Sequence, residues 1–452
     1  IVQQYTLSYH DGMQRLGCEP PSIEPRASGH IIEQIEVVEQ ILKSGLAYES
    51  HGSIYFDLEA YVAGTGTTGD AAVEGTPYGR LSGKVFDDLR TNTRATAGSE
   101  EKRSSLDFAL WKRAEPEHIM RWRSPWGDGF PGWHLECTTM STKYLGESFD
   151  IHGGGLDLQF PHHEAEIAQS HGAFGCDPAR YWMHSNMLTV DGQKMAKSLG
   201  NFITLDEMFT GTHPRLERAF SPMVLRFFML QSHYRSTVDF SGAALDAAEK
   251  GYRRLMGGLR QAEEVLATEI AEEAASLAER SGTLARTPAG PKEDPIALGG
   301  AIVPTADSLP VENKHSQAVA GAVEACWNAM ADDFHTPKTI AALFDMLKIV
   351  QRPEHADAAP ELCRAAARVI RGFTRFVLGL RPDEENAPGG TGVAAGDEAL
   401  HGAMELVIEL RAAARENRDF ETADRIRDRL AEAGIRLEDR KDGPTTWTYG
   451  RK

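Results

Sequence analysis

Residues 190–207 read "VDGQKMAKSLGNFITLDE" and carry two lysines, Lys194 and Lys197, on a short loop that follows a glycine and precedes a predicted helix. Two ammonium groups on such a loop can hold the phosphates of a nucleotide while a group is transferred. By charge alone, the stretch is an ordinary basic loop. The choice between a phosphate-binding loop and a solvated surface loop therefore depends on the rest of the chain.

The composition is that of a globular protein. The chain has 452 residues, 41% hydrophobic and 25% charged, which is enough for about three domains. The net charge of −18 argues against a general polyanion binder, although residues 411–452 carry a small excess of Lys and Arg. No run of ~18 apolar residues and no secretory signal pattern occurs. We therefore expect a cytoplasmic protein without membrane contact, an organellar form being the alternative.

The five cysteines are odd in number and far apart, which fits a reducing compartment better than a disulfide framework. Three of them, Cys176, Cys326 and Cys363, are expected to be packing residues.

Apolar and turn-forming residues divide the chain into parts. Residues 31–49 have helical spacing that ends at a glycine, and residues 52–61, "GSIYFDLEAY", are predicted to form a strand. Residues 120–205 have the mixture of short apolar runs and glycines that is typical of an α/β catalytic domain. Residues 281–310 are rich in Pro and Gly without periodicity, so we predict a flexible insertion there, with helices resuming after it.

Residues 160–169, "FPHHEAEIAQ", place His162 and Glu166 four residues apart, on one face of the helix that Pro161 can begin. His163 and Glu164 then point elsewhere. One nitrogen and one oxygen donor presented together suit zinc. A solvated helix N-terminus with acids near the positive end of the dipole explains the same letters, and spacing alone favours this second interpretation.

Two further stretches contain candidate site residues. In "PGWHLECTTMSTKYLG", residues 131–146, Cys137 follows Trp133, although a lone Cys is usually a small core residue. In "FDIHGGGLDLQF", residues 149–160, a predicted strand contains His152 and leads into three glycines. The glycines either allow a ligand to approach the backbone or form a turn, which is the more common use.

Several motifs together resemble one family. The KMAKS stretch resembles the KMSKS signature of class I aminoacyl-tRNA synthetases, with Ala196 in place of the middle Ser. In order and spacing, further segments resemble cysteinyl-tRNA synthetases: "EPRASGHI", "SLDFALWK", "PWGDGFPGWHLEC", "FDIHGGGLDLQFPHHEAEIAQS", "YWMHSN", "ADDFHTP" and "ADRIRDRLAEAGIRLED". The resemblance runs from about residue 1 to 452, apart from an insertion near 260–312.

The resemblance implies an α/β fold: a Rossmann-like class I catalytic domain, an α-helical bundle and a small C-terminal anticodon-binding module. The expected catalytic domain covers residues 1–250 and includes a connective insertion at about 28–115 and a KMSKS and stem-contact region at 185–250. A helix and a flexible insertion follow over 251–312, and a DALR-like bundle over 313–385. A linker over 386–400 then leads to the anticodon module over 401–452.

The resemblance also implies a zinc site. In that family two Cys, one His and one Glu hold a zinc ion that binds the thiolate of substrate cysteine, and Cys137, His162 and Glu166 match three of these ligands. Because zinc prefers a soft thiolate to a hydroxyl, such a site separates cysteine from serine. Trp133, His152 and Asp157 resemble the family's residues beside the substrate.

The activity implied is that of a cysteine–tRNA ligase, expected to act as a monomer. L-Cysteine attacks ATP, accompanied by Mg²⁺, to give cysteinyl adenylate, and tRNA(Cys) then takes the cysteinyl group. Lys194, Lys197 and Ser198 are expected to bind the phosphates of ATP, with Lys197 in direct contact.

The C-terminal motif implies anticodon contacts by Arg415, Phe420, Asp424 and Asp439. There an aromatic ring can stack on a splayed base, and Arg or Asp can bind base edges. A helix with charge pairs at i,i+4 would explain the same residues structurally.

Three departures from the family stand out. The 452 residues contain no HxGH motif, and the family's first zinc-ligand Cys is not found, since Cys18 lies in a linker-like stretch. We therefore expect the catalytic domain to be incomplete at its N-terminus, with about half a sheet encoded upstream. Phe130 stands where the family usually has a basic residue.

Two alternatives remain. The related mycothiol-pathway ligase uses the same adenylate and zinc chemistry, but residues 423–439 argue against it because that enzyme lacks a tRNA-reading end. The second alternative is a non-catalytic tRNA-binding fragment.

Overall fold

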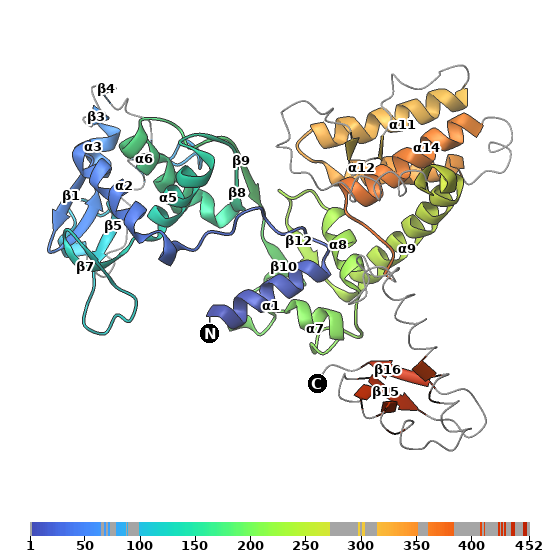
Figure 1. Ribbon diagram of the computed structural model, residues 1–452. Coiled ribbons are helices and arrows are strands. Elements are labelled where there is room, and N and C mark those ends of the chain that lie inside the picture. The colour runs from blue at the N-terminus through green and yellow to red at the C-terminus, as the bar shows by residue number, and fades with distance from the viewer. Residues whose placement is uncertain are drawn as a thin grey trace, which may run out of the picture. The chain divides into compact units, whose positions relative to one another are not determined.

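The computed structural model (Figure 1) describes residues 2–64, 67–68, 71–72, 78–86, 88, 99–271, 297–298, 301–302, 314–350, 360–383, 407–408, 411, 424, 426–427, 429–430, 435–438 and 446–449. The predicted linker over 386–400 and most of the predicted flexible stretch lie outside these residues, as do Arg415, Phe420 and Asp439. The chain divides into two compact units. The larger comprises residues 19–220 and 224–378, and the smaller comprises residues 1–18, 221–223 and 379–452.

An antiparallel sheet of five strands organises the first part of the larger unit. Its order is β1 (Ala47–Ser50), β2 (Ser53–Phe56), β5 (Phe108–Arg113), β7 (Gly127–Pro131) and β6 (Trp122–Ser124). The predicted strand over 52–61 is too long, because the Asp57 side chain accepts a hydrogen bond from the Ala60 N–H at 3.0 Å and begins helix α3 (Leu58–Val62). An Asp at the N-cap favours helix over continued strand.

Three helices cover the core beside this sheet: α2 (Ile31–Lys43), α5 (Trp133–Leu145) and α6 (Glu164–Phe174). The helix predicted over 31–49 ends at Lys43, where Gly45 takes a φ of +79°, and the remainder becomes β1. The completely buried side chains of this core include Val38, Ile41, Leu46, Ile54, Phe56, Leu58, Leu110, Trp111, Leu135 and Ala168. Helices α5 and α6 are thus fixed by a common core.

A parallel pair of strands, β8 (Phe149–Gly155) and β9 (Ala179–Ser185), lies on either side of α6 in the sequence. Strand β8 confirms the predicted strand, and the glycines do not form the turn that was the other expectation. They are strand residues, and a Cβ at Gly154 would lie 2.8 Å from the His163 ring, and one at Gly155 2.4 Å from Asp157 Oδ1. The glycines make room for side chains of the same chain. The 3₁₀ turn η3 (Leu156–Leu158) and the π-turn η4 (Gln159–His163) connect β8 to α6.

The KMAKS stretch lies beside a second small sheet. Strand β10 (Leu188–Val190) pairs with β11 (Gln193–Lys194) and with β12 (Val238–Phe240), and the 3₁₀ turn η5 (Lys197–Leu199) follows. The predicted helix after the loop is confirmed as α7 (Leu205–Thr210), whose start is a capping box between Thr204 and Glu207.

Helices form most of the remaining described part of the larger unit, in agreement with the predicted helical bundle. They are α8 (Pro222–Leu230), α9 (Gly242–Val265), α11 (Lys314–Ala331), α12 (Thr336–Val350), α14 (Pro360–Arg371) and the π-turn η7 (Gly372–Val377). Helix α9 packs on α14, and α11 on α12. Leu259, Leu343 and Ile370 are completely buried among them. Cys326 and Cys363 are buried there as well, and Cys176, after α6, is half-buried.

The remaining described elements are short. In the smaller unit they are α1 (Val2–Arg15) and the antiparallel pair of β15 (Ile435–Glu438) and β16 (Thr446–Tyr449). In the larger unit they are η1 (Ala27–Gly29), η2 (Ser99–Glu101), β3 (Thr67–Thr68), β4 (Ala71–Ala72), β13 (Ala297–Leu298) and β14 (Ala301–Ile302). Among the described residues, no helix is both long and apolar enough to cross a membrane.

Candidate functional site

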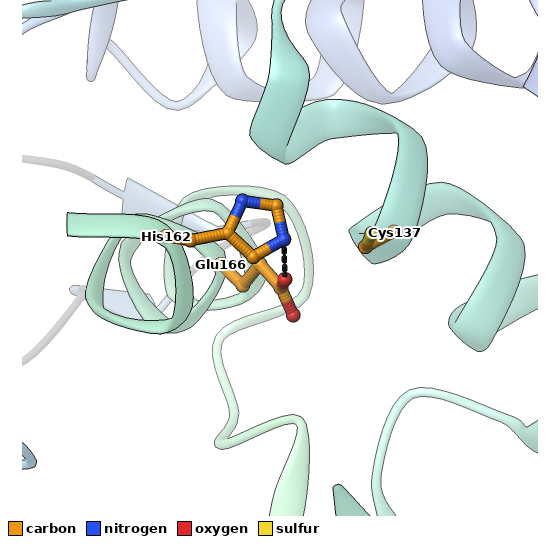
Figure 2. Close-up of side chains that lie close together, drawn as sticks. All are labelled: Cys137, His162 and Glu166. Carbon is orange, nitrogen blue, oxygen red and sulfur yellow. Dashed lines mark ion pairs between the residues drawn. The ribbon is translucent and has the colours of Figure 1, made fainter. Parts of the chain in front are cut away.

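Three side chains of different chemistry converge where α5 meets the start of α6. Cys137 lies on α5, His162 on η4 and Glu166 in the first turn of α6 (Figure 2). One ligand atom from each residue lies within 4.8 Å of the others. His162 and Glu166 are nearly inaccessible to solvent, and Cys137 is half-buried. The sequence spacing of four residues thus places a nitrogen and an oxygen donor together, and the packing of α5 adds a sulfur.

The geometry of Glu166 fits a cation. Its Oε1 atom lies 2.7 Å from His162 Nε2, yet this buried oxygen has no hydrogen-bond partner among the described residues. Oε1 is therefore a buried oxygen donor that remains available to a cation. A thiolate, an imidazole and a carboxylate together are a donor set that zinc accepts.

The electrostatics point the same way. Burial, together with the carboxylates of Glu166 and Glu136, raises the pKa of the Cys137 thiol to about 12. Burial also acts to raise the pKa of Glu166, but the hydrogen bond with His152 and the close approach of the His162 ring outweigh it and lower the pKa to about 2. A divalent cation would offset the cost of burying these groups, because it stabilises the thiolate form of Cys137 and compensates the charge of the buried Glu166 carboxylate.

Two further histidines support the candidate ligands. His134 Nδ1 lies 2.8 Å from His162 Nδ1, and His152 Nε2 lies 2.6 Å from Glu166 Oε2 in hydrogen-bonding geometry. Burial lowers the pKa of His134 to about 4, so its ring is neutral at neutral pH. His134 was not among the candidate residues predicted from the sequence, although its position three residues before Cys137 on one helix was a usable signal.

The residues next to the candidate ligands have other contacts. Glu164 is buried and accepts hydrogen bonds from Gly79 N at 3.0 Å and from Ser82 N at 2.7 Å, so it anchors the 79–82 segment. His163 pairs with His184 through Nδ1 and Nε2 at 2.8 Å. His152, His163 and Glu166 also lie close enough to share an ion, but the hydrogen bond of His152 to Glu166 makes a supporting role the better description.

The predicted substrate residues lie at different distances from this cluster. Trp133 is 60% exposed, and its ring centroid is 4.6 Å from that of His162. Beside it lies a groove of about 400 Å³ whose lining includes Lys112, Phe130 and Trp133. His152 contacts Glu166, whereas Asp157 is exposed in η3. The structure therefore places the exposed Trp133 ring against His162, and His152 against Glu166.

The predicted phosphate-binding residues form a separate exposed group. Lys194, Lys197 and Ser198 are all exposed, and Lys197 Nζ lies 5.5 Å from the centroid of the Phe202 ring. The described residues show no hydrogen bond or ion pair between this loop and Cys137, His162 or Glu166.

Of the four predicted anticodon residues, the structure describes only Asp424. It is exposed and forms an ion pair with Arg427 at 2.9 Å, three residues further along a helical segment. An exposed pair of this kind contributes little to stability.

Comparisons with known proteins define the class. Residues 1–250 match the family model for the class I (C) tRNA synthetase catalytic domain, and residues 327–380 match the model for the DALR domain. The chain thus contains the catalytic domain of a class I aminoacyl-tRNA synthetase followed by a DALR domain.

The relatives define the family. Over 445 residues the chain is 46% identical to a cysteine–tRNA ligase of Porphyromonas gingivalis, covering 98% of this chain and 78% of that protein. It is 44% identical over 455 residues to a cysteine–tRNA ligase of Cytophaga hutchinsonii, covering 99% of this chain and 79% of that protein. The chain belongs to the cysteine–tRNA ligase family.

The different contacts of the two glutamates give a prediction. Glu164→Gln should lower the free energy of unfolding by about 1–3 kcal/mol, because one of the N–H groups that the carboxylate accepts would face an NH₂ group instead. Bound metal should stay unchanged. Urea unfolding and metal analysis of the purified protein measure both, with the exposed Glu39→Gln as control. A loss of metal together with stability would show that Glu164 belongs to the ligand cluster.

Proposed function

We propose that the protein that carries this chain activates L-cysteine with ATP and transfers the cysteinyl group to tRNA(Cys). The observation that carries the proposal is the convergence of Cys137, His162 and Glu166 within 4.8 Å, in a chain of the cysteine–tRNA ligase family. Sulfur, nitrogen and oxygen donors in one buried cluster are not needed to stabilise a helix pair. They do suit the recognition of a thiol substrate.

These three residues would hold a zinc ion. When bound, zinc supplies a soft acceptor for the substrate thiolate, and it discriminates against serine because a neutral hydroxyl is a weaker ligand. His134 and His152 orient the donors, since each contacts a candidate ligand at 2.8 Å or less. Trp133 borders the same space with an exposed aromatic surface and would close it around the small substrate side chain.

The phosphates of ATP need cationic groups rather than a nucleophile. Adenylate formation is an attack by the cysteine carboxylate on the α-phosphorus with loss of pyrophosphate, so positioning and charge stabilisation carry the step. Lys194 and Lys197 are exposed ammonium groups on one loop and would contact the phosphates, Lys197 most directly, with Ser198 beside it. Mg²⁺ would accompany ATP.

For the tRNA, we propose that Arg415, Phe420, Asp424 and Asp439 contact the anticodon. An Arg or Asp side chain can read the edge of a splayed base, and Phe420 can stack on one. The exposure of Asp424 is compatible with this role.

The metal-ligand assignment predicts the effect of Cys137→Ala. The variant should contain less zinc and should lose cysteine-dependent exchange of pyrophosphate into ATP by about 100-fold or more, because a thiolate ligand is removed from the donor set. Zinc analysis of the purified variant measures the metal content, and the pyrophosphate exchange assay measures the loss of activity.

Cys176→Ala is the matched control, because Cys176 is a half-buried cysteine outside the cluster, with its Sγ 3.6 Å from the Glu147 carbonyl. It should keep both zinc and exchange. Undiminished exchange in Cys137→Ala would show that the ligand assignment is wrong. A natural protein that binds tRNA(Cys) without any exchange would favour a non-catalytic tRNA-binding role.

The anticodon assignment predicts a different pattern for Arg415→Ala. The kcat/KM for cysteinylation of tRNA(Cys) should fall about tenfold or more, because a base or phosphate contact is removed, while pyrophosphate exchange stays unchanged. Parallel measurement of the two reactions separates the effects. Equal losses in both would count against an anticodon contact.

A further inference from the structure

Asn201 is a buried residue in an otherwise exposed loop. Only 1% of it is accessible, whereas Lys194, Lys197 and Ser198 are exposed. Its side chain bonds back to the loop at two points. Asn201 Oδ1 accepts a hydrogen bond from Ala196 N at 2.8 Å, and Asn201 Nδ2 donates one to the Lys194 carbonyl at 3.0 Å. The amide thus fastens the backbone between the two lysines.

The position of these bonds explains why they matter. Before the loop, β11 pairs with β10 as far as Lys194, and Met195 N donates to the Leu188 carbonyl at 3.3 Å. After it, the turn η5 begins at Lys197. The chain changes direction between these two anchors, and Asn201 bonds both to Lys194, the last paired residue, and to Ala196, which lies beyond the sheet pairing. Gly200, with a φ of +63°, forms the turn that brings Asn201 back to the loop.

We infer that Asn201 is a positioning residue that sets the separation and direction of the Lys194 and Lys197 ammonium groups for the phosphates of ATP. This inference rests on the proposed function. Few side chains can bond to the loop at both points, because a donor and an acceptor are required at once. An aspartate of the same size keeps the acceptor but turns the second contact into a repulsion between two oxygens.

The test is Asn201→Asp in the natural protein, measured by pyrophosphate exchange. The KM for ATP should rise about tenfold and kcat should fall, because the phosphate ligands are no longer held in place, while the KM for cysteine stays within about twofold. A loop with only a structural role would instead lower the melting temperature and reduce the active fraction, leaving both KM values unchanged.

Asn186→Asp is the matched control. Asn186 makes the same two kinds of bond, accepting from Met187 N at 2.8 Å and donating to the Arg235 carbonyl at 2.9 Å, outside the KMAKS loop. The Asn186→Asp variant should leave the KM for ATP unchanged.

Gly200→Ala is a second way to displace the lysines, because alanine strains the left-handed turn at this position, although its added Cβ meets no atom within 4 Å. It should raise the KM for ATP as well.

An unchanged KM for ATP in both Asn201→Asp and Gly200→Ala would overturn the inference, and so would an equal rise in the KM for cysteine. If Asn201→Asp does not fold, Gly200→Ala decides alone. Failure of the proposed function has a different signature, since the unmodified protein would then show no cysteine-dependent exchange at all.

Discussion

The buried carboxylate of Glu166 is the constraint on which the site depends. A charge removed from water is costly unless it is compensated, so the groups around it are not free to vary. His162 and His152 each approach one of its oxygens within 2.7 Å, and Cys137 faces the same cluster from α5. A bound divalent cation would complete this compensation. The fold has to bring α5, η4 and β8 together for any of these contacts to exist.

Packing of α5 against α6 meets that requirement. Thr138 on α5 donates a hydrogen bond to Gln169 on α6 at 2.6 Å, and Leu135 and Ala168 share the core with the five-stranded sheet. The candidate metal ligands therefore lie on or next to rigid, well-buried helices. Lys194 and Lys197, the proposed phosphate ligands, instead lie on an exposed loop to which Asn201 makes two hydrogen bonds. In the proposed function, the buried cluster therefore selects the substrate, and the exposed loop binds ATP.

Spacing along the sequence predicted the parts of the site that are local. Pro161 and the separation of four residues placed His162 and Glu166 together, and the strand of β8 and the helix α7 were expected. Contacts between distant segments were not readable in the same way. The contact of His134 with His162 depends on how α5 packs on η4. The glycines after His152 are strand residues rather than a turn, and their neighbours His163 and Asp157 became clear only in the fold. The strand predicted to reach residue 61 was wrong because the cap formed by Asp57 is stronger than the apolar pattern.

The central claim is that Cys137, His162 and Glu166 select cysteine through a metal ion, and replacement of zinc by Co²⁺ tests it most directly. Cobalt reports each bound thiolate through an intense sulfur-to-metal charge-transfer absorption, so a spectrum can be recorded as amino acids are added. L-Cysteine should increase this absorption at a stoichiometry of one, and L-serine should leave it unchanged. An absorption that does not respond to cysteine, or that responds equally to serine, would contradict the account.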